Sequence, residues 1–262
     1  MDPTRVRPTQ ALLVLDRIGK TFRQGRHQLL HALRDVSLTV DAGEIVALVG
    51  ESGSGKSTLG RIALGLLAPD AGTVSFDGKR FDQLSPDHFR ELRTGMQPIF
   101  QDPTSSLNPR RTVRELLTQA LWKTPANAGE RCVTLLEDVG LRPAVQYLDR
   151  YSHELSGGQR QRVSIARSLA MAPKLIVADE PLSGADVSIR GQVLNLLLDI
   201  QRSRNVAYLM ITHDISVARA FADRVAVMMK GELVEVGPAE QVLRTPSHAY
   251  TRRLVAAVPA LG

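Results

Sequence analysis

What this chain of 262 residues lacks narrows its possible functions. A single cysteine, Cys132, excludes an internal disulfide framework and any cluster held by four cysteines. No apolar run reaches the roughly 18 residues needed to cross a bilayer, and the polar, proline-containing start does not resemble a signal peptide. Aromatic residues make up only 4% of the chain, so a base-stacking surface for nucleic acid is not expected. These absences predict a cytoplasmic protein that reaches a membrane only through a partner.

The residues that are present are typical of a globular protein. Hydrophobic residues make up 43% of the chain, enough to bury a sizeable core, which excludes a disordered chain. The length fits one large domain or one domain with an inserted subdomain. The formal net charge is +6, but lysine and arginine are spread along the chain. This charge alone therefore does not distinguish nucleic acid, anionic lipid or nucleotide as a partner.

The first part of the chain has a pattern of strands, a helix and a hairpin. Predicted strands, from apolar and β-branched runs, are 11–18, 33–40 and 44–50. A helix is expected from Ser57, and its apolar positions are Leu59, Ile62, Ala63 and Leu66. A turn at 69–72 is followed by a stretch that reads as strand, Asp-Gly turn and strand.

Residues 85–150 change in character, because they are richer in arginine, leucine and glutamate and contain short helical patterns such as 112–122. They predict a helical insert. An α/β pattern then resumes, with a helix at 157–171, a strand at 174–179, a helix at 188–203, a strand at 207–212 and a hairpin over 224–237. The two apolar strands lack alternation, which is typical of a parallel sheet covered on both faces.

The stretch GESGSGKST at residues 50–58 fits the pattern G-x-x-x-x-G-K-[ST] between an expected strand and helix. Glycines let successive backbone N–H groups point at a phosphate, and the helix N-terminus favours its negative charge. Lys56 is placed to contact the β- and γ-phosphate oxygens, and the Ser57 hydroxyl to bind Mg²⁺. A chance glycine-rich turn does not explain this setting. The residues expected at the phosphates are Gly50, Ser52, Gly53, Ser54, Gly55, Lys56, Ser57 and Thr58.

An acid pair ends the apolar run LIVADE. A carboxylate at the carboxyl end of a parallel strand beside a phosphate loop reaches Mg²⁺, usually through water, which suits Asp179. Glu180 projects one residue further, where it could polarise a water in line with the γ-phosphate. Two carboxylates could otherwise simply end a strand at the surface, but the phosphate loop upstream favours the metal and base roles.

A second glycine-rich stretch, HELSGGQRQR at 153–162, also precedes an expected helix. Ser156 offers a hydroxyl, Gly157 and Gly158 expose backbone N–H groups, and the helix dipole favours negative charge. A serine cap alone would explain Ser156 but not two successive glycines, which lower helix stability. The stretch therefore predicts a second anion-binding site, without indicating which phosphate it binds.

The phosphate loop, FQDP at 100–103, LSGGQ at 155–159 and THD at 212–214 together resemble the ATPase subunit of an ATP-binding cassette (ABC) transporter, over nearly the whole chain. The resemblance implies an α/β P-loop NTPase fold with a RecA-like parallel-sheet core, an N-terminal antiparallel β subdomain and an inserted α-helical subdomain. The implied boundaries are an ATPase domain at 11–250, with its core near 11–84 and 165–237 and its helical subdomain near 85–164, and a subfamily-specific tail at 238–262.

The resemblance also implies roles for single residues, with ATP and Mg²⁺ as cofactors. Gln101 resembles the glutamine that touches Mg²⁺ and the attacking water, and His213 the histidine that contacts the γ-phosphate. Phe22 stands near the position of the aromatic residue that stacks on adenine. Two subunits would face each other head to tail, each closing its signature stretch on the nucleotide held by the other's phosphate loop. The residues implied for that contact are Ser156, Gly157, Gly158, Gln159 and Asp186.

Two positions depart from expectation. SGAD at 183–186 stands where the family commonly has Ser-Ala-Leu-Asp, so Asp186 is kept while Ala185 replaces a leucine. This segment helps two subunits sense each other, and the smaller side chain bears on how tightly they associate. Pro98 falls in the strand expected before Gln101, which predicts an edge strand because proline cannot donate to the ladder.

The stretches FQDPTSSLNPRRTV (100–113) and TPSHAYTRRLVAAVP (245–259) resemble the peptide/nickel importer subfamily. This implies ATP hydrolysis coupled to uptake of di- or oligopeptides or of nickel as a chelate, at the cytoplasmic side of the inner membrane. The implied partners are a second, identical or different, ATPase subunit, two transmembrane permease subunits and an extracytoplasmic substrate-binding protein, with no nucleic acid. Since the chain lacks the C-terminal cysteine group of some relatives, no iron–sulfur cluster is expected.

Other classes of protein fit less well. A soluble ABC ATPase of translation or DNA repair would normally carry tandem cassettes or a coiled-coil insert, and a small-molecule kinase would lack LSGGQ. A subunit of a soluble enzyme complex, such as one that cleaves phosphonates, stays open as the alternative.

Overall fold

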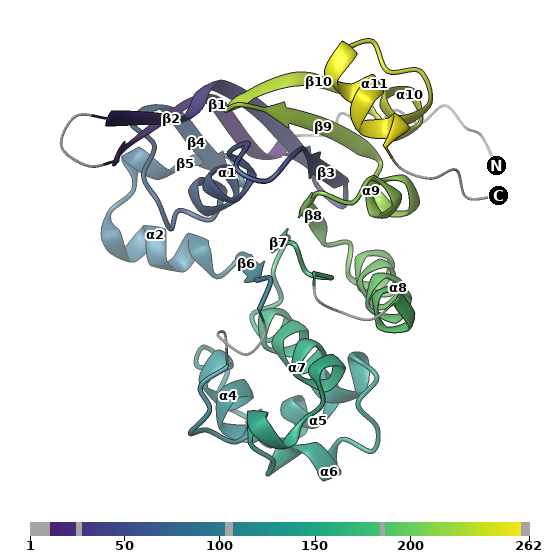
Figure 1. Cartoon of the computed structure of the whole chain (residues 1–262). Helices are drawn as coiled ribbons and strands as arrows, with labels where there is room; N and C mark the ends of the chain where they lie inside the picture. The colour runs from purple at the N-terminus through teal and green to yellow at the C-terminus, as the bar shows by residue number, and fades with distance from the viewer. Residues whose placement is uncertain (1–10, 25–27, 103–106, 184–186, 258–262) are drawn as a thin grey trace, which may run out of the picture.

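The structure, a computed structural model, describes residues 11–24, 28–102, 107–183 and 187–257. It contains two sheets, with a cluster of helices at the far end of the molecule (Figure 1). A four-stranded sheet has the order β2-β1-β4-β5, with β1 Ala11–Gln24, β2 Gln28–Asp41, β4 Ala71–Phe76 and β5 Lys79–Arg80. A six-stranded sheet has the order β10-β9-β3-β8-β7-β6, with β3 Ile45–Val49, β6 Met96–Ile99, β7 Leu175–Asp179, β8 Ala207–Thr212, β9 Arg224–Met229 and β10 Glu232–Pro238.

The four-stranded sheet is antiparallel throughout, which confirms the expected N-terminal β subdomain. Strands β1 and β2 run beyond their predicted ends because they pair with each other as far as Gln24 and Gln28. The predicted Asp-Gly turn joins β4 to β5, and both of its residues have positive φ, 52° at Asp77 and 73° at Gly78. Such a turn matches the twist of the two strands that it joins.

The six-stranded sheet forms the parallel core that the apolar strands predicted. Strands β6, β7, β8, β3 and β9 run parallel, and β10 pairs antiparallel with β9 as the expected hairpin. All residues of β3 and β8 are buried, because the sheet is covered on both faces. Helix α1 (Lys56–Ala63) and the four-stranded sheet cover one face, while α8 (Val187–Arg204) and α9 (Ile215–Phe221) contribute to the cover of the other.

Helix α1 is shorter than the apolar spacing suggested. It ends at Ala63, with Leu64 as its C-cap, and Gly65 follows with a φ of 61°. Leu59, Ile62 and Ala63 are buried, but Leu66 lies beyond the end of the helix and is 47% exposed, so the expected helical spacing does not extend to it. Gly65 adopts the left-handed conformation that commonly ends a helix.

The helical insert packs as one unit around the helix that begins in the LSGGQ stretch (155–159). Helices α4 (Val113–Ala120), α5 (Ala128–Asp138) and α6 (Val145–Leu148) lie around α7 (Gly157–Leu169) (Figure 1). Their apolar side chains share one buried cluster with α8 and with one face of the main sheet. The short 3₁₀ helices are Phe81–Gln83 and Ser152–Glu154, and α2 spans Pro86–Arg93.

Strand β6 lies inside the range 85–164 expected for the helical subdomain, yet it pairs with β7 in the main sheet. A strand was expected before Gln101, but a run of four residues carries too little pattern to show that it belongs to the main sheet and not to the insert. The strand is at the edge of the sheet, as Pro98 predicted. The Ser168 hydroxyl donates to the Pro98 carbonyl oxygen at 2.7 Å, which ties α7 to this edge.

Helices α10 (Ala239–Arg244) and α11 (Ala249–Ala256) close the described chain and pack on β9 and the neighbouring face of β3. Tyr250 of α11 is only 5% exposed. Within the described ranges, none of the helices combines the length and the apolar character that a membrane span requires.

Candidate nucleotide site

Four neighbouring parallel strands bring the predicted site residues together at the carboxyl ends of the strands of the main sheet. Strand β3 leads into the phosphate loop, β7 ends in Asp179 and Glu180, and β8 ends just before His213. The edge strand β6 ends two residues before Gln101. Since the carboxyl ends of parallel strands share an edge, residues from distant parts of the sequence meet there, the usual ligand position of an open α/β sheet.

The phosphate loop, residues 50–55, depends on glycine where it passes close to other backbone. Gly50 has a φ of 153°, and a Cβ there would lie 2.1 Å from the Met228 carbonyl oxygen. Gly55 has a φ of 109°, and a Cβ there would lie 2.5 Å from the Ala32 carbonyl oxygen. Any side chain would push the loop away from the sheet, so the curled conformation requires both glycines.

Lys56 is held inside this loop. Its Nζ donates to the carbonyl oxygens of Gly50 at 2.8 Å and of Glu51 at 2.7 Å, and the residue is 5% exposed. Burial lowers the pKa of Lys56, while the nearby carboxylates, chiefly Glu180, oppose that shift. The loop therefore carries an ammonium group at the N-terminus of α1, where a phosphate would be favoured.

Ser57 and Asp179 meet at the base of the loop. The Ser57 hydroxyl donates to Asp179 Oδ1 at 3.0 Å. Burial raises the pKa of Asp179, and the hydrogen bond from Ser57 acts against this. Two hard oxygen donors at this spacing suit neighbouring positions on Mg²⁺, which is usually bound by one or two carboxylates together with phosphates. No group of three or more His, Cys, Asp or Glu side chains that could hold a metal ion is found in the described ranges.

Glu180 adopts a conformation that is rare for a residue with a side chain. Its φ is 47°, and its N–H donates to the Ile211 carbonyl oxygen at 2.9 Å across to β8. Its carboxylate Oε1 lies 3.0 Å from His213 Nδ1. Left-handed backbone outside glycine is uncommon and concentrates at functional sites. This backbone conformation directs the Glu180 carboxylate toward the end of β8. It thereby brings together Glu180, the predicted base, and His213, the predicted contact of the γ-phosphate.

Gln101 lies on the loop after β6 and is exposed. Its Nε2 donates to the hydroxyl of Ser183 at 3.2 Å. Ser183 follows the acid pair by three residues, and its N–H donates to the Glu180 carbonyl oxygen. Gln101 is thus linked to the loop after β7, while its role toward Mg²⁺ remains a prediction.

Ser156 is the N-cap of α7. Its hydroxyl accepts from the N–H of Gln159 at 3.3 Å, and the Gln159 side-chain oxygen accepts from the Ser156 N–H at 2.9 Å. This capping box explains both polar residues locally. It does not explain Gly157, because a Cβ there would meet nothing within 4 Å. The open, exposed N-terminus of α7 therefore fits an anion supplied from outside the chain.

The remaining phosphate-loop residues differ in exposure: Ser52 and Gly53 are exposed, Thr58 is half-buried and Ser54 is buried. Phe22 lies on β1 and is 37% exposed, with the Lys20 ammonium 5.8 Å from its ring centroid. It is therefore not a core residue, and its stacking on adenine stays a prediction. Asp186 lies outside the described residues.

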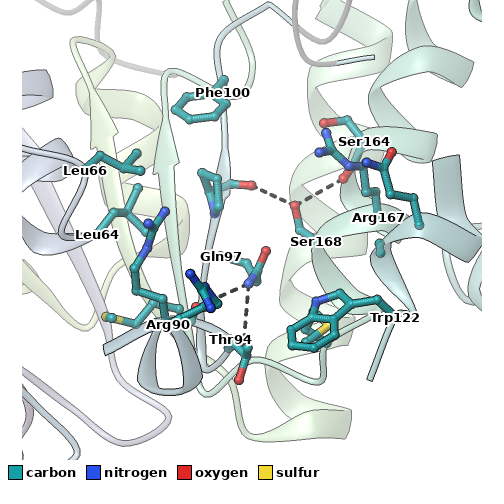
Figure 2. A pocket seen from close by; sticks show the side chains of 16 residues that line it. Leu64, Leu66, Arg90, Thr94, Gln97, Phe100, Trp122, Ser164, Arg167 and Ser168 are labelled. Atoms are coloured by element: carbon teal, nitrogen blue, oxygen red, sulfur yellow. Dashed lines mark hydrogen bonds between the residues drawn. The ribbon is translucent and has the colours of Figure 1, made fainter. Parts of the chain in front are cut away.

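A groove runs between the main sheet and the helical insert (Figure 2). This hollow of about 460 Å³ is bounded by α2, β6, the end of α4 and α7. Trp122, 57% exposed, and Arg90 stand on its walls, and Phe100, next to Gln101, lies at one end. Gln97 Nε2 donates to the Thr94 carbonyl oxygen at 3.2 Å, and Ser168 reaches Pro98 across the floor. The groove thus borders the loop that leads to the nucleotide site.

Three contributors to this region were missed from the sequence. Ser183 binds Gln101, Trp122 borders the groove, and Tyr250 touches the phosphate loop. Ser183 lies in the SGAD stretch, three residues after Glu180, and this short distance in sequence could have placed it near the site. Trp122 closes an amphipathic helical pattern, which indicates burial as readily as a docking surface. No local sequence pattern connects Tyr250 with Glu51, which lies 199 positions earlier in the chain.

The sequence matches the profile of the family described as ABC transporter over residues 33–183. It is 50% identical over 234 residues to the glutathione import ATP-binding protein GsiA of Escherichia coli (strain K12), and equally to that of Shigella boydii serotype 4 (strain Sb227). These alignments cover 88% of this chain and 37% of the relatives, so the chain spans just over a third of the length of the curated relatives it matches.

Solved structures agree with this result. The dimeric ATP-binding cassette MJ0796 in a post-hydrolysis state, bound to ADP and Pi, is 30% identical with a TM-score of 0.77, over 87% of this chain and 98% of that one. The cbiO1 protein from Clostridium perfringens, part of the ABC transporter complex cbiONQ, is 29% identical with the same TM-score, over 88% and 90% of the two chains. The chain therefore belongs to the ABC transporter family and has the fold of its ATP-binding cassettes.

Proposed function

We propose that this chain binds and hydrolyses ATP and thereby powers an importer of small peptides. The observation that carries the proposal is the meeting of the phosphate loop, the Ser57–Asp179 pair and the Glu180–His213 pair at one edge of the sheet. Phosphoryl transfer to water requires positioning, charge neutralisation and a group that orients the water. Each of these tasks has a candidate residue at this edge.

The proposed roles follow from the geometry. The N–H groups of the phosphate loop and Lys56 bind the β- and γ-phosphates. Mg²⁺, when bound, neutralises charge on the β- and γ-phosphate oxygens, and the residues that would hold it are Ser57, Asp179 and Gln101. Glu180 accepts the proton of the attacking water or orients it, and His213 donates a hydrogen bond to the γ-phosphate. Phe22 stacks on the adenine.

A second ATPase subunit completes each site in this proposal. The N-terminus of α7 exposes Ser156 and Gly157, with space beyond the glycine, and Gly158 and Gln159 follow in its first turn. The phosphate loop of a subunit facing it head to tail, with ATP bound, presents an anion of the required kind. ATP then holds two subunits together, and its hydrolysis separates them. Asp186 belongs to the same contact.

The groove beside β6 is the proposed docking place for a transmembrane permease subunit. An exposed tryptophan, apolar floor residues and arginines form a surface of the kind that anchors a partner. The groove borders the loop that carries Gln101, so a nucleotide-dependent shift of that loop moves the partner. The chain is then peripheral on the cytoplasmic side of the plasma membrane, held there by two permease subunits.

Small peptides are the proposed cargo, delivered by an extracytoplasmic binding protein. The relatives with 50% identity are named for import of glutathione, which is itself a tripeptide. A nickel chelate is the second cargo class, because the same subfamily resemblance covers both. The relatives named for import favour an importer over a subunit of a soluble enzyme complex.

Copurification tests the proposal. The chain should be isolated with its partners from membranes solubilised in a mild detergent, and the ATPase activity of the complex measured with and without the associated binding protein. Recovery with two permease subunits, and stimulation by the binding protein loaded with glutathione or a dipeptide, is expected. Recovery with soluble enzyme subunits and no permease would overturn the importer assignment.

A further inference from the structure

The last described helix reaches the phosphate loop. The Tyr250 hydroxyl accepts the N–H of Glu51 at 3.1 Å, across 199 positions of sequence. Tyr250 is 5% exposed, and its ring packs among the apolar side chains of β3, β9 and α9. The hydroxyl therefore arrives from a fixed ring rather than from a mobile surface side chain.

The hydrogen bond acts on a peptide group that also holds Lys56. The N–H of Glu51 and the carbonyl of Gly50 belong to the same planar unit. Its N–H donates to Tyr250, and its carbonyl oxygen accepts from the Lys56 ammonium at 2.8 Å. Hydrogen bonds at the two ends of one peptide group polarise and strengthen each other. Tyr250 thus acts on the group that places the ammonium.

Glu235 of β10 fixes the start of α11. Its carboxylate accepts from the N–H and hydroxyl of Ser247, at 2.7 and 2.8 Å, and from the N–H of His248 at 3.1 Å. His248 then caps the helix, because its Nδ1 accepts from the N–H of Tyr250 at 3.1 Å. The hydroxyl of Tyr250 is therefore placed by a chain of contacts that begins in the main sheet.

We propose that Tyr250 is a positioning residue of the nucleotide site, which orients the Gly50–Glu51 peptide and thereby the Lys56 ammonium. The tail, expected from sequence only as a subfamily-specific extension, then becomes part of the site. The inference rests on the proposed function, because the loop is taken to bind ATP. Preorganising the loop lowers the cost of ordering it when the nucleotide binds.

The test is Tyr250→Phe, which keeps the ring and removes only the hydroxyl. In the variant, hydrogen exchange at the Glu51 amide should become faster, because its acceptor is lost. The Kd for a fluorescent ATP analogue, and the KM for ATP, should rise about 2- to 10-fold, the effect of one neutral hydrogen bond. The kcat at saturating ATP and the unfolding temperature should stay close to the wild-type values. Tyr147→Phe, on α6 in the helical insert, is the matched control and should change none of these quantities.

A second variant, Glu235→Gln, weakens the anchor of α11 and should raise the same Kd and KM while Tyr250 is intact. Unchanged Glu51 exchange and unchanged ATP affinity in Tyr250→Phe would overturn the inference. If the wild-type chain binds no ATP, the proposed function fails instead, and the exchange measurement still tests whether Tyr250 positions the loop.

Discussion

Glu180 Oε1 and His213 Nδ1 lie 3.0 Å apart, although 33 positions of sequence separate the two residues. Glu180 follows β7 and His213 follows β8, and these strands are neighbours in the sheet. The Glu180 side chain is 21% exposed and that of His213 is 61% exposed. The pair therefore joins a sheltered carboxylate to a largely exposed histidine on the side from which a ligand would arrive.

Glu180→Gln tests the role of this carboxylate. Glutamine keeps the size of the side chain and polar atoms that can hydrogen-bond to His213, but it cannot take a proton from water. Hydrolysis should fall by about 10²- to 10⁴-fold, the range for loss of a general base, while ATP still binds. Phosphate release and binding of a fluorescent ATP analogue measure the two effects, and size-exclusion chromatography with ATP should show a stable dimer. Unchanged turnover would remove Glu180 from the mechanism.

Gly157→Asp tests the second anion site. The helix dipole stabilises a carboxylate in the first turn of α7, so the variant should fold normally. A side chain at this position also meets no neighbouring atom. The same carboxylate would repel a phosphate brought by a partner. Nucleotide binding by the monomer should be unchanged, and turnover of the assembled complex should drop by at least about tenfold, equal to 1.4 kcal/mol.

The matched control is Gly129→Asp. Gly129 lies in the first turn of α5, and a side chain there also meets no neighbouring atom. Turnover of this variant should equal that of the wild type. If both substitutions lower turnover equally, the loss comes from charge or folding rather than from a phosphate at α7.

Trp122→Ala tests the groove. The indole is 57% exposed, so its removal leaves folding nearly unchanged, whereas a buried aromatic anchor at an interface is typically worth 2 kcal/mol or more. Copurification with the permease should fall at least about tenfold, and the unfolding temperature of the isolated chain should be unchanged. Val145→Ala is the control, because Val145 is 66% exposed on α6 and does not line the groove. Normal assembly of Trp122→Ala would exclude the groove as the docking place.

Glu235→Gln tests the anchor of α11 through its pH dependence. Partial burial acts to raise the pKa of Glu235, but the hydrogen bonds from Ser247 and His248 help to lower it to about 2, from a usual value of 4.5. A lowered pKa means that the ionised carboxylate stabilises the fold above about pH 4.5, and that this contribution is lost as the pH falls toward 2. The variant should lose about 1 kcal/mol of unfolding free energy at neutral pH, since solvent screens part of the interaction.

Urea denaturation from pH 8 down to pH 3 measures this effect. The difference between variant and wild type should be constant above pH 5 and should shrink below pH 4.5. A difference that does not depend on pH would mean that the carboxylate contributes by packing and not by charge.

Much of the site could be read from short patterns, because its chemistry is local. The glycine spacing of residues 50–58 can be recognised without knowing any distant contact. The structure adds that Gly50 and Gly55 pass so close to other backbone that a Cβ would not fit. The acid pair was found for the same reason, since a buried strand and its last residues are contiguous. The Ser156 cap followed from its own helix start.

Other features could not be found in this way. A strand containing Pro98 was expected before Gln101, but the helical subdomain was taken to include it, and only the pairing of β6 with β7 assigns the strand to the main sheet. Leu66 fitted the spacing of α1, but the helix ends at Ala63 and the chain turns at Gly65. The partner of Gln101 depended on how two loops from separate strands approach each other.

The family, the phosphate loop and the acid pair could all be identified from short stretches of sequence, because they reside in contiguous residues whose chemistry does not depend on distant contacts. Contacts between distant residues depended on the tertiary fold: the Glu180 carboxylate meets the His213 ring, and the Tyr250 hydroxyl meets the backbone N–H of Glu51. Strand order and the docking of α11 create both contacts. They arise from the burial of apolar surface over the whole chain, which no short stretch of residues specifies.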